Sequence, residues 1–416
     1  QLVPIDAALV QKSAKGELYY LDANQHKYAV VKNGSVFNAG DAMAINGTIR
    51  IISEYGDVTN YDDFNTLSTN SDDVFADEYK GIDIATGNVE LLAAHGTLYN
   101  TKYLESGQNI TLMAAKGLTN FAYSVYAGKN ISLTATEGDV INIATLESYA
   151  GDVTLQAYNG NVINGVKNEF VEGKGDIITY GGNVTLLAQG SGSVTNYGDI
   201  IAINANATDK VNSGSITLKS EHHDVDNFDD FNTYRIGDTY YKDYKAIDHG
   251  SIESNDASYN LANNNLTVSA REGHVFNNKD YLVALGNVEL EAKTGLSSFG
   301  QAIYAGKNIT MTATEGDLFN KAELLSVEGD ITLKAEKGTV VNLIGGDMIA
   351  RNGNVTLEAG DEANNTIRYV DAIGNAYELP ATQGQAAGDS IVITKQFYKD
   401  TDGKWYHLSP SGAMDI

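Results

Sequence analysis

The chain has 416 residues, no cysteine, and a formal charge of −26 from 54 acidic and 28 basic residues. The missing cysteines exclude disulfides, thiolate metal sites and a thiol nucleophile. The negative charge opposes binding to nucleic acid and to anionic membranes. There is no apolar run of membrane-spanning length and no signal peptide, so we expect no membrane insertion by this segment.

Residues 1–33 do not follow the pattern of the rest of the chain. The run LYYLDANQHKYAVV places two apolar segments around the turn-forming residues Asp22, Ala23 and Asn24, which predicts a β-hairpin. We expect this N-terminal hairpin to cap the repeats that follow, because an exposed sheet edge invites pairing with another chain.

A short template recurs from residue 34 onward, most clearly as GKNISLTATEGDVIN at 128–142 and GKNITMTATEGDLFN at 306–320. A glycine-led apolar strand is followed by a second glycine-led strand that ends in asparagine. Where no insertion intervenes, the steps are about 20 to 22 residues, which predicts a solenoid coil of three short strands. The terminal asparagines are Asn38, Asn60, Asn100, Asn120, Asn142, Asn164, Asn196, Asn227, Asn277, Asn320 and Asn342, and a twelfth copy has Ser298.

Alternate residues of the first strand in each template are expected to face inward. These inward sets are Val89, Leu91, Ala93; Ile110, Leu112, Ala114; Ile131, Leu133, Ala135; Val153, Leu155, Ala157; Val184, Leu186, Ala188; Val288, Leu290, Ala292; and Ile331, Leu333, Ala335. Stacked coils would place like residues over one another and form one continuous core. The asparagines would then form a structural ladder, bonded to the backbone and to each other.

A larger duplication overlies the template and divides the region 34–361 into two units of about 170 to 180 residues, 47–213 and 214–361. GTIRIISEYGDVTNYDDFNT in the first unit matches GSITLKSEHHDVDNFDDFNT in the second. Insertions rich in Asp, Asn, Tyr and Ser are expected at 66–84, 166–180, 197–213 and 232–263. They are either the partner-binding elements or tolerated decorations.

Residues 362–416 are expected to form a β-rich cap or linking segment, since the template fades after GNVTLEAG. Within it, FYKDTDGKWYHL has an Asp-Gly turn signal between aromatic runs, which predicts a second hairpin.

Two acidic pairs occupy duplicated positions, Asp62 with Asp63 and Asp229 with Asp230. Carboxylates in pairs can act as general acid and base, or can bind calcium together with Asn65 and Asn232. Both pairs also suit a solvated acidic loop, and no EF-hand or RTX spacing is present. We therefore expect no cofactor and no metal site; calcium is the alternative, with these four aspartates as its candidate ligands.

Histidines and tyrosines give weaker signals. His222 and His223 stand beside Asp224, but adjacent strand residues point to opposite faces and do not readily share a metal ion. Tyrosines recur on the third strand of the coil and would stack on sugar rings if outward or pack in the core if inward, which we favour. They are Tyr103, Tyr126, Tyr149, Tyr281 and Tyr304.

An enzyme is the third functional class to weigh, since some polysaccharide lyases and hydrolases are parallel β-helices. Their short GHG and RIK signatures are absent, only five arginines are present to bind an anionic polysaccharide, and no carboxylate cluster stands out on the outward rows. We expect no catalytic residues.

The segments GNVTLLA, GKNISLTATEGDVIN and GDVTLQAYNGNVIN resemble the repeats of filamentous haemagglutinin-type exoproteins of Gram-negative bacteria, over residues 34–360. The resemblance implies a right-handed parallel β-helix, secretion by the two-partner route, and a role as an adhesin in attachment, aggregation or biofilm. The secretion domain of that family, with its NPNL and NPNGI motifs, is not visible, so an interior or processed segment is expected. Autotransporter passengers share the scaffold.

The sequence therefore predicts an all-β protein, a right-handed parallel β-helix of about 13 coils of about 20 to 22 residues. We expect a non-enzymatic fibre segment, extracellular or on the bacterial cell surface. Its partners would be a host or bacterial surface protein or glycan, or other copies of itself. The alternative is a self-assembling filament or surface-layer subunit, and a polysaccharide-degrading enzyme comes third.

Overall fold

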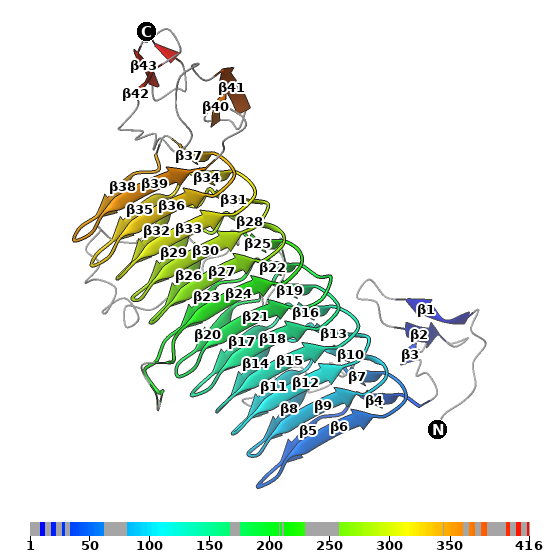
Figure 1. The fold of residues 1–416 in the computed structure, drawn as a ribbon. Helices are drawn as coiled ribbons and strands as arrows, with labels where there is room; N and C mark the ends of the chain where they lie inside the picture. The colour runs from blue at the N-terminus through cyan, green and yellow to red at the C-terminus, as the bar shows by residue number, and fades with distance from the viewer. Residues whose placement is uncertain are drawn as a thin grey trace.

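The computed structural model describes residues 34–61, 81–166, 175–207, 212–228, 258–343 and 345–360 of the repeat region. It also describes 9–12, 18–21, 27–29, 209, 366–370, 376–380, 397–399, 405–408 and 414–415. These residues form strands, turns and a few irregular connections, and no α-helix is found among them (Figure 1). In this part of the chain no helix has the length and apolar character needed to span a membrane.

Three parallel sheets of twelve strands each run the length of the repeat region. The asparagine sheet contains the strands that end in the recurring asparagine: β4 (Val36–Asn38), β7 (Val58–Asn60), β10 (Thr97–Asn100), β13 (Gly117–Asn120), β16 (Val140–Asn142), β19 (Val162–Asn164), β22 (Val194–Asn196), β25 (Val225–Asn227), β28 (His274–Asn277), β31 (Gly295–Ser298), β34 (Leu318–Asn320) and β37 (Val340–Asn342).

The strands that follow along the chain form the third sheet: β5 (Ala42–Ala44), β8 (Ile82–Ala85), β11 (Tyr103–Ser106), β14 (Ser124–Ala127), β17 (Thr145–Ser148), β20 (Ile177–Thr179), β23 (Ile200–Ala202), β26 (Tyr259–Ala262), β29 (Tyr281–Ala284), β32 (Ala302–Ala305), β35 (Glu323–Ser326) and β38 (Met348–Ala350).

The leucine sheet completes each coil with the apolar half of the template: β6 (Ile49–Ser53), β9 (Val89–Ala93), β12 (Ile110–Ala114), β15 (Ile131–Ala135), β18 (Val153–Ala157), β21 (Val184–Ala188), β24 (Ile216–Ser220), β27 (Leu266–Ala270), β30 (Val288–Ala292), β33 (Ile309–Ala313), β36 (Ile331–Ala335) and β39 (Val355–Ala359).

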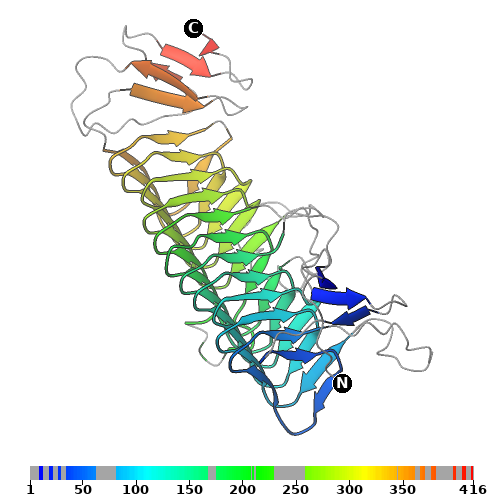
Figure 2. The same ribbon diagram turned by 90° about the vertical axis from the view of Figure 1, so that its right-hand side faces the viewer.

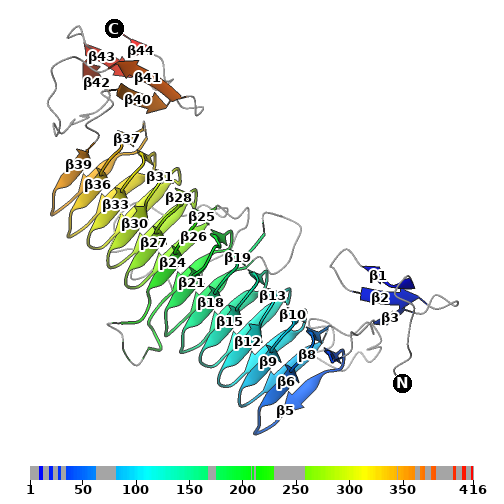
Figure 3. The same ribbon diagram turned by 45° about the vertical axis from the view of Figure 1, so that its right-hand side comes forward.

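Neighbours within each of the three parallel sheets differ by three in strand number, because the chain visits these sheets in turn and then climbs one coil. Figures 2 and 3 show the coils stacked along one axis, from β4–β6 at one end to β37–β39 at the other. The fold is a right-handed parallel β-helix, as predicted. The described residues contain twelve coils, one fewer than the number expected from the sequence.

The core lies on the axis of the helix and is made of columns of like residues. Ile131, Leu133 and Ala135 of β15 lie directly against Val153, Leu155 and Ala157 of β18. All seven inward sets predicted from the sequence are at most 1% exposed. Each coil alone has no partner for these side chains, so the apolar surface is buried only by stacking.

Glycine marks the turn between the leucine and asparagine sheets because the turns of successive coils approach closely there. A Cβ on Gly160 would lie 2.3 Å from the carbonyl oxygen of Gly138 in the coil before it. A side chain at this position would therefore force the two turns apart.

Three of the four expected insertions leave the helix at the same corner, between the asparagine sheet and the third sheet. The described chain stops at Tyr61, Val166 and Phe228 and resumes at Gly81, Gly175 and Ser258. The fourth lies at the next corner, between β23 and β24.

The predicted boundaries of these insertions require correction. Strands β20, β23 and β26 of the third sheet fall inside the stretches 166–180, 197–213 and 232–263, and β8 begins inside 66–84. Sequence reasoning missed these strands because they lack the glycine-led Val-x-Leu-x-Ala pattern and follow segments of irregular length.

Antiparallel strands occur at both ends of the chain. β1 (Gln11–Lys12), β2 (Leu18–Leu21) and β3 (Lys27–Ala29) form one sheet, with Tyr20 opposite Tyr28 in the predicted hairpin. The C-terminal region contains the pair β40 (Thr366–Val370) and β41 (Ala376–Pro380). It also contains β42 (Phe397–Lys399), β43 (Trp405–Leu408) and β44 (Met414–Asp415), with Tyr398 opposite Tyr406 in the second predicted hairpin.

Candidate functional site

The asparagines that end the strands of the asparagine sheet form a ladder with a break between Ser298 and Asn320, and they are buried in all but the first and last coils. Each side-chain amide donates to the side-chain oxygen of the next coil, as from Asn120 to Asn142 at 2.9 Å and from Asn142 to Asn164 at 2.8 Å. The same amide of Asn142 donates to the carbonyl of Ala144 in the following turn, at 2.9 Å. The ladder satisfies buried polar groups within the protein, which is a structural role.

In several coils the residue two positions after the asparagine faces the interior and is small. Ala122, Ala144 and Ala322 are at most 2% exposed, and Gly198 offers its carbonyl to Asn196. In two coils it is a lysine instead, Lys102 after Asn100 and Lys279 after Asn277. Both lysines are fully buried.

Both lysines belong to the coil that follows a long insertion. The coil of Asn60 is interrupted after Tyr61, and Lys102 lies in the next coil. The coil of Asn227 is interrupted after Phe228, and Lys279 lies in the next coil. Each lysine reaches past the interrupted coil to the one before it, where its amine meets the carbonyl of Gly40 or Tyr197.

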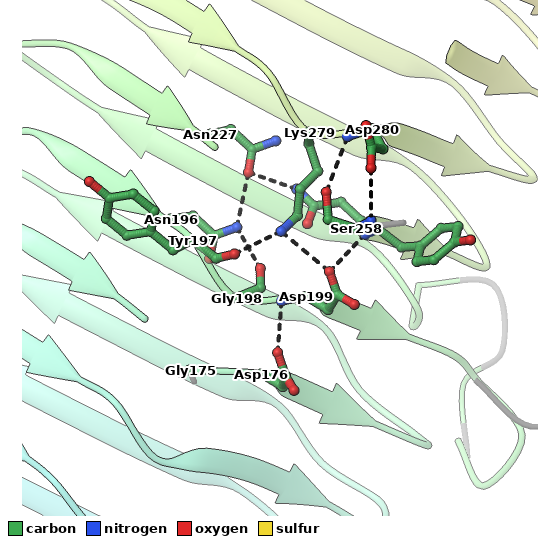
Figure 4. A network of polar contacts seen from close by, with 12 residues as sticks. Gly175, Asp176, Asn196, Tyr197, Gly198, Asp199, Asn227, Ser258, Lys279 and Asp280 are labelled. Carbon is green, nitrogen blue, oxygen red and sulfur yellow. Dashed lines mark hydrogen bonds and ion pairs between the residues drawn. The ribbon is translucent and has the colours of Figure 1, made fainter. Parts of the chain in front are cut away.

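The Lys279 amine lies in a closed polar network (Figure 4). It donates to the carbonyl of Tyr197 at 2.8 Å and lies 3.3 Å from Oδ1 of Asp199, whose side chain is also fully buried. The same carboxylate oxygen accepts the backbone N–H of Tyr259 at 2.7 Å. Asp199 thus anchors the first strand after the insertion to the coil before it.

The reentry of the chain after this insertion is fixed by a second aspartate. Asp280 accepts the backbone N–H of Ser258 at 3.2 Å and returns its own N–H to the Ser258 hydroxyl, also at 3.2 Å. The chain after the insertion is therefore hydrogen-bonded to both neighbouring coils, through Asp199 of the coil before it and Asp280 of the coil after it.

The Lys102 network has the same layout with an additional carboxylate. Nζ of Lys102 lies 3.5 Å from Oδ1 of Asp83 and 3.8 Å from Oδ1 of Asp41. Asp41 accepts the N–H of Ile82 at 2.8 Å, as Asp199 accepts that of Tyr259. Asp83 occupies the position that Asn260 has in the second unit.

The Asp83 carboxyl group is held by two further donors, the backbone N–H of Ala42 at 2.9 Å and the amide of Asn60 at 2.8 Å. Burial raises the pKa of Asp83 above its ordinary value, and the nearby Lys102 charge opposes that rise. A carboxylate and an ammonium buried together cost several kcal/mol each in lost hydration, on the order of what their attraction returns.

The calcium candidates Asp62, Asp63, Asp229 and Asp230 lie outside the described residues. His222 and His223 lie in the turn between β24 and β25, where Nδ1 of His222 is 2.9 Å from the Glu272 carboxylate. Within the described ranges, no group of three or more His, Asp or Glu side chains is placed to hold a metal ion.

The tyrosines of the third sheet divide between two environments. Tyr149 is 52% exposed, whereas Tyr304 is 9% exposed. Tyr281 stacks on Tyr259 at 5.3 Å between ring centroids, and Tyr304 follows at 6.3 Å. These rings join Ile201, Leu261 and Val283 in a second apolar cluster on the outer face of this sheet.

A second row of rings, which the sequence analysis did not identify, lies along the asparagine sheet. Tyr197, Phe228, Phe276 and Phe299 come from four successive coils, with neighbouring centroids 5.1, 5.6 and 5.9 Å apart. The signal that reveals this row is aromatic residues one position before or after the ladder asparagine.

Sequence reasoning also missed Lys102 and Lys279. The available signal was their position, two residues after a ladder asparagine, where the coils of Asn120, Asn142 and Asn320 have Ala. This position indicates a buried ion pair only when the insertion in the preceding coil is also known.

The three parallel sheets and their axial core define the molecule as a parallel β-helix solenoid, and buried Lys–Asp pairs follow two of the interruptions at one of its corners. Comparison with protein-family models, curated proteins and solved structures finds no match in any of the three.

Proposed function

We propose that the chain is a non-enzymatic fibre segment of an extracellular or cell-surface adhesin, in which a stiff β-helix presents its insertions to partners. The resemblance of the repeats to filamentous haemagglutinin-type exoproteins supports this proposal. The partners would be proteins or glycans of a host or neighbouring bacterial surface.

The observation that carries the proposal is the pair of buried lysines. Ala122, Ala144, Gly198 and Ala322 occupy this position in other coils, whereas the two long insertions are each followed by a fully buried Lys–Asp pair. Replacing a small apolar residue by buried charges brings a desolvation penalty. The same buried Lys–Asp arrangement follows both long insertions at equivalent places, and we infer from this repetition that the two insertions have a use.

The proposal can be tested by deletion, because both insertions can be removed so that the number of residues between the ladder asparagine and the next strand matches that of an uninterrupted coil. Deleting residues 62–80 joins Tyr61 to Gly81 and leaves Ile82 three positions after Asn60. Tyr103, the register partner of Ile82, likewise stands three positions after Asn100. Deleting 229–257 joins Phe228 to Ser258 and places Tyr259 where Asp199 stands relative to Asn196. The matched control deletes 166–174 at the same corner, where no buried lysine follows.

The variants are compared for binding to epithelial cell layers, bacterial cells and a glycan array, with thermal unfolding as the check on folding. We expect the parent chain and the 166–174 deletion to bind, and the double deletion to lose binding while remaining folded. If the double deletion binds every target as the parent does, the insertions are not the adhesive part.

Self-assembly is a second candidate, favoured by the end strands of the three sheets, each of which pairs with a single neighbour among the described strands. The core residues that are only half-buried all belong to the first and last coils, among them Ile51 and Leu357. Strand edges that have no partner within the described ranges, with the same template on both axial faces, suit head-to-tail stacking of copies, which gives open filaments. Electron microscopy of the full chain tests this: filaments that disappear in Leu357→Lys support it, and single short rods at high concentration exclude it.

A further inference from the structure

We propose that Lys102 and Asp83 join through a spontaneous amide bond between their side chains, which covalently ties the strand after the first insertion to the next coil. The observation behind this proposal is the placement of an amine and a carboxyl group 3.5 Å apart, both with side chains inaccessible to solvent. The 3.5 Å distance joins Nζ of Lys102 to Oδ1 of Asp83, and the nitrogen would attack Cγ, the carbon to which that oxygen is bonded. Holding the two groups together in a fixed geometry removes much of the entropic barrier to their reaction.

The surroundings favour condensation over a lasting ion pair. Amide formation converts two buried charges into one neutral group and releases water to the solvent, so it removes the desolvation penalty of both ions. The pKa of Asp83 is raised by burial, which favours the protonated carboxyl group that the reaction needs.

The step balances without any external reagent. The Lys102 ammonium passes one proton to the Asp83 carboxylate, which leaves an amine and a carboxylic acid. The nitrogen lone pair attacks Cγ of Asp83, a second nitrogen proton moves to Asp41, and Asp41 returns it to the departing hydroxyl group. One C–N bond forms, one C–O bond breaks, and one water leaves.

The neighbouring residues match the roles that this reaction requires. Ala42 N–H and the Asn60 amide donate to the two oxygens of Asp83, at 2.9 and 2.8 Å, where negative charge develops in the tetrahedral intermediate. Asp41 lies 3.8 Å from Nζ, and its side chain is 62% exposed, which connects the proton acceptor to solvent.

Mass spectrometry of the full chain under denaturing conditions tests the proposal and does not depend on whether a variant folds. We expect an intact mass lower than the sequence mass by one water. Proteolysis should yield a branched peptide that joins the segment with Lys102 to the segment with Asp83. Trypsin should fail to cleave after Lys102.

Two variants make the result specific. Lys102→Met has no amine, so its intact mass should equal its sequence mass and the branched peptide should disappear. Asp41→Asn retains Lys102 and Asp83 but lacks the proton acceptor, so freshly made protein should contain a mixture of bonded and unbonded chains. A free Lys102 peptide with the full sequence mass in the parent chain overturns the proposal, as does a water loss that persists in Lys102→Met.

Discussion

Asn277 donates its side-chain amide to the hydroxyl of Ser298 at 3.3 Å, and the serine has no amide with which to continue the ladder. Among the described residues, no donor reaches Oδ1 of Asn320 in the following coil, although that atom is buried. A buried acceptor without a partner costs about 1–3 kcal/mol. Ser298 is therefore the weak link of a ladder that is otherwise continuous from Asn38 to Asn342.

Ser298→Asn should repair this link. The new amide would donate to Asn320 as Asn142 donates to Asn164, and we expect the chain to gain about 1 kcal/mol in the free energy of unfolding. The measurement is the urea midpoint of the full chain. Thr154→Asn, on the outward side of β18, is the matched control and should not stabilise. A repaired ladder with an unchanged or lower midpoint would show that the corner at Ser298 has no room for an amide.

Interrupting the ladder in its middle should have the opposite effect. Asn142→Ala removes the acceptor of Asn120 and the donors to Asn164 and Ala144. With these buried groups left unpaired, we expect a loss of about 2–4 kcal/mol, seen as a lower urea midpoint. Thr154→Ala should change the midpoint little, because its side chain faces outward. Equal midpoints for the two variants would contradict the structural role of the ladder.

The contribution of the buried Lys279–Asp199 pair to the free energy of unfolding can be measured by substitution. Lys279→Met leaves Asp199 buried without its cation, which should destabilise the chain by about 3–5 kcal/mol. Adding Asp199→Asn removes the stranded charge and should restore part of the loss, since an amide oxygen can still accept the N–H of Tyr259.

The control for this pair is an ion pair at the surface. Lys337 lies 3.4 Å from Glu315 with both side chains about half or more exposed, and exposed pairs contribute roughly 0–1 kcal/mol. Lys337→Met should therefore barely shift the urea midpoint. If Lys279→Met shifts it no more than Lys337→Met does, the buried pair does not hold the corner.

Alkaline pH should unfold the protein partly through Tyr304. Burial raises the pKa of this phenol from 10.0 to about 12. Between these values the unfolded chain loses a proton that the folded chain retains, so the free energy of unfolding falls as pH rises through this window. Tyr304→Phe should flatten this fall. Urea midpoints of both proteins at a series of pH values provide the measurement, and parallel curves would contradict the assignment.

The solenoid and its ladder could be predicted from the sequence because both depend on a local rule. A residue such as Leu133 faces inward by strand alternation, and the same spacing places Leu155 beside it one coil later. The hairpin of Tyr20 and Tyr28 was visible for a similar reason, a turn signal between two apolar runs.

Only the tertiary structure decided what happens where the spacing is interrupted. Asn60 and Ile82 belong to one coil, but the insertion between them separates them in the sequence. The sequence therefore shows that Lys102 stands two residues after an asparagine, but it does not show which residues Lys102 contacts. Packing brings Lys102 to Asp83 and Lys279 to Asp199 across residues far apart in the chain. The physical reason is that alternation and repeat length fix neighbours within and between regular coils, whereas an insertion leaves space that is filled from a different coil.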